Sequence, residues 1–86
     1  MKLYIISNNE SGGYDTFDSA VVCAENEEEA RKIHPGEWVK DKWWEKPVKD
    51  CDSSWATRLE NINVEYIGEA DEGIEPGVIL ASFNAG

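Results

Sequence analysis

Long apolar runs, cysteine pairs and basic clusters are all missing from this 86-residue sequence. No apolar run is long enough to cross a bilayer, and no charged segment leads into an apolar one near Met1, so the sequence predicts neither a membrane span nor a secretory signal. The two cysteines, Cys23 and Cys51, lie in unrelated contexts and do not form the disulfide framework of a small secreted domain. We therefore expect a cytoplasmic protein with both thiols reduced and no membrane partner.

Basic residues are scarce, with 8 lysines and arginines against 18 acids and a formal net charge of −10. A protein that grips duplex nucleic acid does so by neutralising phosphates, so this balance argues against duplex DNA or RNA as a direct partner. The same charge attracts basic surfaces and keeps the protein soluble. Solubility alone is a sufficient explanation, and the sequence leaves both readings open.

Signatures of catalysis and metal binding are also lacking. Cys23, His34 and Cys51 could supply three zinc ligands, but the sequence holds neither a CxxC pair nor an HxxxH pair. The acids on either side of Cys51 disfavour a reactive thiolate, and Gly12-Gly13 is typical of a turn rather than of a phosphate-binding loop. We expect no enzyme activity, no cofactor and no metal site.

The segment from Asp18 to Ile33 is the most informative part of the chain. Its apolar run Ala20–Ala24 predicts a strand. Asn26 is suited to cap a helix, with Glu29 at the position from which a carboxylate reaches back to the cap. Pro35 and Gly36 predict that the helix ends near Ile33 or His34. A helix this short needs a sheet to pack against.

The remaining apolar segments predict three further strands. Lys2–Ser7 is apolar on both faces and is expected in the centre of the sheet, joined by a short turn to a strand over Tyr14–Ala24. Asn61–Gly68 and Val78–Phe83 are expected to form a second hairpin, with the last strand paired back on the third. The sequence thus predicts one α+β domain over residues 1–86, with an antiparallel sheet of about four strands in β-β-α-β-β order and one short helix packed on it. Because so small a chain buries little surface, a second copy that covers apolar surface would add stability, and a homo-oligomer is one possibility.

Between Gly36 and Asn61 the periodicity fails and the tryptophans gather. They are Trp38, Trp43, Trp44 and Trp55, interleaved with lysines. We expect an ordered, Trp-rich excursion between the helix and the third strand, with one helical turn near Ser53–Arg58 capped by Ser53 or Ser54. The indoles could pack this excursion onto the sheet, anchor a protein partner, or stack on a small ligand such as a nucleotide.

Carboxylates form a second candidate site. They are Glu69, Asp71, Glu72 and Glu75, with Glu25, Glu27 and Glu28 as further members if the chain brings them together. Acids two residues apart on a strand are spaced at ~6.6 Å, which could imitate alternate phosphates of a nucleic-acid strand. The run lacks the spaced ligands of a calcium loop. A solvated turn and helix face is the alternative.

Four segments carry a resemblance to a known group of proteins. They are Tyr14–Val22 (YDTFDSAVV), Glu27–Pro35, Val64–Ala70 and Gly77–Gly86, which ends in Ser-Phe-Asn-Ala-Gly. With these segments the chain resembles a family of small uncharacterised proteins encoded by bacteriophages and prophages. The resemblance implies a viral protein active in the host cytoplasm, since small phage accessory proteins often bind a host machine or its signalling molecule. It implies no activity and no site residues.

Taken together, these features predict a non-catalytic binding protein. We expect a phage-encoded modulator or inhibitor of a host defence or nucleic-acid-handling protein, which binds the basic surface of that protein through an acidic, tryptophan-anchored surface. The first alternative is a protein that sequesters a nucleotide-type small molecule in a pocket lined by Trp43, Trp44 and Trp55. The second is a structural accessory protein whose acids serve solubility alone.

Overall fold

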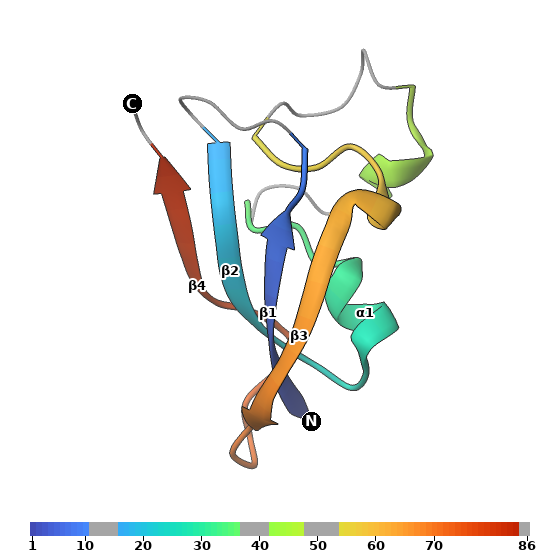
Figure 1. Cartoon of the computed structure of the whole chain (residues 1–86). Coiled ribbons are helices and arrows are strands. Elements are labelled where there is room, and N and C mark those ends of the chain that lie inside the picture. The colour runs from blue at the N-terminus through green and yellow to red at the C-terminus, as the bar shows by residue number, and fades with distance from the viewer. Residues whose placement is uncertain (11–15, 37–41, 48–53, 85–86) are drawn as a thin grey trace.

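The chain folds as an α+β protein in which one short helix packs on a four-stranded antiparallel sheet (Figure 1). This computed structural model describes residues 1–10, 16–36, 42–47 and 54–84. The strands are β1 (Lys2–Asn8), β2 (Thr16–Ala24), β3 (Ile62–Glu69) and β4 (Gly77–Asn84), and the helix is α1 (Glu27–Arg31). The predicted fold class and the predicted order of the elements are confirmed.

The sheet has the order β3-β1-β2-β4, with β1 and β2 as a central antiparallel hairpin. A central β1 fits its apolar pattern, because Tyr4 and Ile6 are buried on the helix side while Leu3 and Ile5 are half-buried on the other. Three bulges disturb the outer pairings. Ile67 is the extra residue where β3 meets β1. Where β4 meets β2, the extra residues are Ile79 of β4 and Asp18 of β2.

The predicted hairpin between the last two strands is wrong. β3 pairs with β1 and β4 pairs with β2, so the two lie at opposite edges of the sheet. The connection over residues 70–76 can span roughly 23–25 Å, more than the ~14 Å across three strand spacings. It crosses the end of the sheet, where the Ala70 amide donates to the Met1 carbonyl at 3.1 Å and the Ile74 carbonyl lies 4.0 Å from the buried Cys23 Sγ. A β4 paired with β3 and a β4 paired with β2 fit the local sequence equally well, so the sequence does not distinguish between them.

Helix α1 begins as its sequence predicts and ends sooner. The Asn26 side chain accepts a hydrogen bond from the Glu29 amide at 2.8 Å, which confirms the N-cap. The regular helix ends at Arg31, because Lys32 and Ile33 donate to carbonyls only three residues back. Ala30 is fully buried and Ile33 packs against the same core, as their spacing predicts. The Arg31 guanidinium donates to the carbonyls of Leu59 and Ile62 and so ties the helix to the start of β3.

The described parts of the excursion between α1 and β3 cover one end of the sheet (Figure 1). They contain two short 3₁₀ helices, η1 (Trp43–Glu45) and η3 (Leu59–Asn61). The helical turn predicted at Ser53–Arg58 is wrong for residues 54–58, while Ser53 lies outside the described residues. A helical turn, η3, begins instead at Leu59, where Arg58 is at the N-cap position and makes no side-chain cap. Ser54 is buried.

Candidate functional site

Carboxylates from separate segments gather at the end of the sheet where β1 begins. Lys2 is paired with both Ala24 of β2 and Glu69 of β3, so the residues that follow these two strands lie beside the N-terminus. Glu25 and Glu69 flank one shallow depression of about 300 Å³ together with Met1 and Lys2. Two of the predicted carboxylates from distant parts of the chain, Glu25 and Glu69, therefore share a surface.

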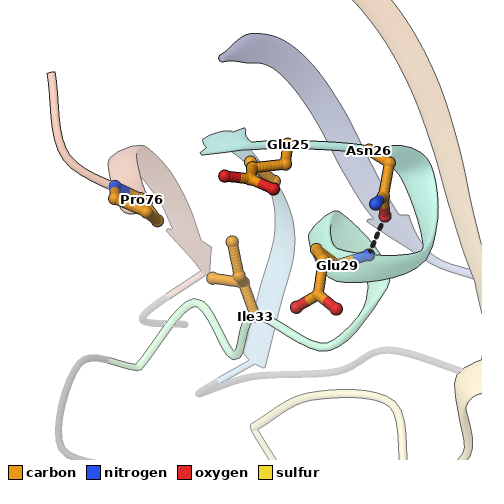
Figure 2. Close-up of a pocket in the computed structure, with 6 residues that line it drawn as sticks. Glu25, Asn26, Glu29, Ile33 and Pro76 are labelled. Atoms are coloured by element: carbon orange, nitrogen blue, oxygen red, sulfur yellow. Dashed lines mark hydrogen bonds between the residues drawn. The ribbon is translucent and has the colours of Figure 1, made fainter.

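A second depression joins the start of α1 to the connection that precedes β4. It has a volume of about 280 Å³, and Figure 2 shows Glu25, Ile33 and Pro76 around it, with the Asn26 cap at one side. Pro76 lines this depression together with Glu25 and Glu29, so the last part of the 70–76 connection lies close to the start of the helix. We call this surface the acidic end. Its members, all exposed, are Glu25, Glu27, Glu28, Glu29, Glu69, Asp71, Glu72 and Glu75.

Local chemistry explains why acids are accommodated here. Glu27 and Glu28 lie in the first turn of α1, where free backbone amides favour negative charge. The 70–76 connection turns at Asp71, whose carbonyl accepts from the Ile74 amide, and Gly73 supplies the left-handed φ of 89° that the turn requires. Only Glu69 lies in a strand, so the regular two-residue spacing that would imitate phosphates along a strand is not formed.

Few described cations offset the charge of the acidic end. The ion pairs of Arg31 with Glu27 and of Lys32 with Glu28 span 3.9 Å between exposed carboxylates and half-exposed bases, so each contributes little. The Tyr66 hydroxyl donates to Glu69 Oε2 at 2.7 Å, and this hydrogen bond raises the pKa of the tyrosine. Within the described residues, no three carboxylate, thiol or imidazole groups come together closely enough to hold a metal ion. The acids form a broad surface rather than a chelating point.

Three tryptophans, Trp43, Trp44 and Trp55, lie at the opposite end of the sheet, where the excursion packs on Phe17. Trp43 and Trp55 are only 3% and 2% exposed, and the Trp43 indole donates to the Ala56 carbonyl at 2.9 Å. Trp44 is half-buried against Trp43 in an edge-to-face contact with ring centroids 4.7 Å apart. Trp38 lies outside the described residues. Trp43 and Trp55 therefore pack the excursion onto the sheet, which is one of the roles expected from the sequence.

His34 packs in the core, which is one of the two roles expected of the only histidine, at a helix end. The His34 ring is buried, stands edge-to-face 5.1 Å from Trp43, and accepts from the Gly36 amide at Nδ1 over 2.9 Å. We call Phe17, His34, Trp43, Trp44 and Trp55 the aromatic end. Pro35 and Gly36 indicated the end of the helix here, and the sequence left open whether the imidazole packs or complements the helix dipole.

Glu10 has a role that sequence reasoning missed, because its carboxylate joins the β1–β2 turn to the excursion. It accepts from the Thr57 amide at 2.7 Å, from the Thr57 hydroxyl, and from the Asn61 amide group at 3.0 Å. Partial burial alone would raise the pKa of Glu10, but the hydrogen bonds from Asn61 and Thr57 together lower it. These partners lie 47 and 51 residues away in the sequence, so no local pattern could have revealed them.

Cys23 is buried beneath the N-terminus, 3.8 Å from the Met1 sulfur, while Cys51 lies outside the described residues. No helix in the described parts of the chain is long and apolar enough to span a membrane. No protein-family model, no curated protein and no solved structure matches this chain. Its function therefore has to be inferred from the acidic end and the aromatic end of its sheet.

Proposed function

We propose that this chain is a non-catalytic binding protein that docks its acidic end on the basic surface of another protein. The observation that carries the proposal is that the start of α1, the end of β3 and the 70–76 connection meet at one end of the sheet and together carry eight exposed carboxylates. Residues so far apart in the sequence make one surface because β3 and β4 lie at opposite edges.

The charge of this surface suits recognition of a groove lined by lysine and arginine. Such a surface steers a basic partner over several ångströms, accelerates encounter, and repels acidic proteins. Its exposed carboxylates keep most of their hydration before binding, so they contribute more to association rate and specificity than to raw affinity. A basic groove that ordinarily binds nucleic acid has the complementary charge, which makes a nucleic-acid-handling protein the partner class that we propose.

An apolar side chain in the middle of these acids supplies a candidate anchor. Ile74 is 37% exposed and lies in the connection between Glu72 and Glu75. Trp43 and Trp55 are too deeply buried to anchor a partner, so Ile74 takes their place as the apolar anchor of the proposed surface. A pocket in which these two indoles bind a nucleotide has no support from their burial. The resemblance to phage proteins favours a host protein as the partner, and inhibition or modulation as the consequence.

The test compares two variants of equal charge. One neutralises the acidic end through Glu69→Gln, Asp71→Asn, Glu72→Gln and Glu75→Gln, and the other neutralises four exposed acids elsewhere through Asp18→Asn, Glu45→Gln, Glu60→Gln and Glu65→Gln. Each immobilised protein is challenged with host lysate at low and at high salt, and the captured proteins are identified by mass spectrometry and then purified for titration.

We expect the parent and the control variant to retain one set of basic proteins at low salt and to lose it at high salt, while the acidic-end variant retains none of it. Equal loss from both variants would reduce the effect to net charge and contradict the proposal. Capture that resists salt would contradict it as well. If all three proteins retain no basic partner, the structural accessory role would replace the proposed function.

A further inference from the structure

Strand β4 is an open edge of the sheet. It pairs with β2 on one side, and no other described segment pairs with its outer side (Figure 1). Its outward backbone amides and carbonyls are therefore available to another strand. Leu80 is 69% exposed and Ile79 is 50% exposed, so apolar surface accompanies this free backbone.

Sheet edges in soluble proteins usually carry features that block pairing, such as charged side chains, prolines or bulges. The other edge, β3, has two exposed glutamates, Glu65 and Glu69. β4 has the sequence GVILASFN, with no charge and no proline, although 30% of the whole chain is charged. Its own bulge is at Ile79. A second register shift lies opposite Ser82 and Phe83, but there the extra residue, Asp18, belongs to β2, so β4 has no extra residue from Leu80 to Asn84.

We propose that β4 pairs with β4 of a second copy of this chain, antiparallel over Leu80–Asn84, to form a dimer with a continuous eight-stranded sheet. An antiparallel pair of identical strands is related by a two-fold axis, which is the symmetry of the commonest homodimers. Over these five residues the axis passes through Ser82, so the two copies of Ser82 lie opposite each other. Ser82 is exposed, and both Leu80 side chains come to lie beside the partner strand.

The charge distribution favours a second copy in this orientation. Each chain carries a net charge of −10, so two copies can associate only where the acids stay apart. The acidic end lies beside Gly77, five residues from Ser82, and antiparallel pairing sends the two acidic ends in opposite directions. At ~3.4 Å per residue they are separated by roughly 34 Å, several times the Debye length of ~8 Å in physiological salt. Parallel pairing would bring them side by side.

The dimer also leaves the proposed recognition surface free. In the antiparallel arrangement the two acidic ends point outward at opposite ends of the eight-stranded sheet, so one dimer presents two copies of that surface. The proposal does not depend on the docking function, because it rests on the edge strand alone.

The test measures mass by sedimentation equilibrium from micromolar to millimolar protein. The wild type is expected to approach twice its monomer mass of 9.7 kDa. Ser82→Glu places two like charges directly opposite each other at the two-fold axis and is expected to give a monomer. Asn63→Glu makes the same kind of change on an exposed residue of the other edge strand and is expected to leave the dimer intact. Circular dichroism verifies that each variant is folded.

Charge complementation separates pairing from misfolding. Ser82→Glu and Ser82→Lys are expected to be monomers when separate and to form a one-to-one dimer when mixed, because opposite charges then meet at the axis. A wild type that stays monomeric at millimolar concentration would overturn the proposal and leave β4 as an edge for a strand of a different protein. A dimer that survives Ser82→Glu, or a mixture that stays monomeric, would overturn the β4 pairing.

Discussion

The two ends of the sheet use different chemistry. At the aromatic end, Trp43 and Trp55 are at most 3% exposed and close one end of the core. At the acidic end, all eight carboxylates are exposed and no described residue buries them. Both sets stood out in the sequence as candidates for recognition. The two sets differ in burial, so an unusual composition has different causes at the two ends. The buried indoles serve stability, and in our proposal the exposed carboxylates serve binding.

The difference follows from what each end has to cover. The excursion after α1 contributes the end of the core beside Phe17, and large indoles supply apolar area with few residues. The other end is closed by a helix start and a glycine-containing turn, both of which satisfy their backbone groups locally and leave side chains in water. Acids there cost little, and none of them carries the packing of the sheet.

Substitution at the aromatic end should have the largest effect. Trp55→Ala removes a side chain that is 2% exposed and leaves a cavity in the core, at an expected cost of about 3–5 kcal/mol in the free energy of unfolding. A chain of this size is stabilised by only ~5 kcal/mol or little more, so the variant should keep at most a small part of the parent's free energy of unfolding. Urea denaturation followed by circular dichroism measures this cost.

Trp44→Ala is the matched control for this prediction, because Trp44 is half-buried beside the same cluster. Its loss of stability should be clearly smaller than that of Trp55→Ala. Equal losses, or a Trp55→Ala variant as stable as the parent, would remove the distinction between core and surface at this end.

A carboxylate at the aromatic end should behave unlike those at the acidic end. Glu10→Gln weakens the hydrogen bonds from Thr57 and Asn61 and is expected to cost on the order of 1 kcal/mol at neutral pH, a modest value because the group is partly exposed. Burial raises the pKa of Glu10, but the hydrogen bonds outweigh it and hold the pKa below its ordinary value of 4.5.

The pH dependence of that cost has a definite sign. A carboxyl whose pKa is lower in the folded state stabilises the fold above its unfolded pKa, and this stabilisation is lost as the pH falls through the folded pKa. The difference between the parent and Glu10→Gln should therefore be full at neutral pH and should vanish in acid. Urea denaturation across this range measures it, with Glu45→Gln at an exposed site as the control. A difference that grows as the pH falls would contradict the assignment.

The smallest effect is expected at the helix start. Asn26→Ala removes the hydrogen bond to the Glu29 amide and should cost about 0.5–1 kcal/mol. Asn63→Ala, which loses an exposed hydrogen bond with Asn9, is the control and should cost less. Urea denaturation of the two variants side by side measures the difference, and a larger cost at Asn63 would show that the cap does not hold α1 in place.

Sequence reasoning reached the local features of the fold and stopped at the long-range ones. The two apolar faces of β1 placed it in the centre of the sheet, and Asn26 with Glu29 located the start of α1, because both depend on neighbouring residues. The partner of β4 depends on which edge of the central hairpin remains free, which a seven-residue connection does not specify. The burial of Trp43 and the Glu10 bonds likewise depend on contacts between distant segments.

The measurement that tests the division between the two ends most directly is urea denaturation of the four-site acidic-end variant, with changes at Glu69, Asp71, Glu72 and Glu75. If these acids serve recognition, their loss removes mutual repulsion and costs no packing, so the free energy of unfolding should equal or exceed that of the parent in low salt. A loss of about 2 kcal/mol or more, similar to that of a core substitution, would show that the acidic end holds the fold together and would contradict the account.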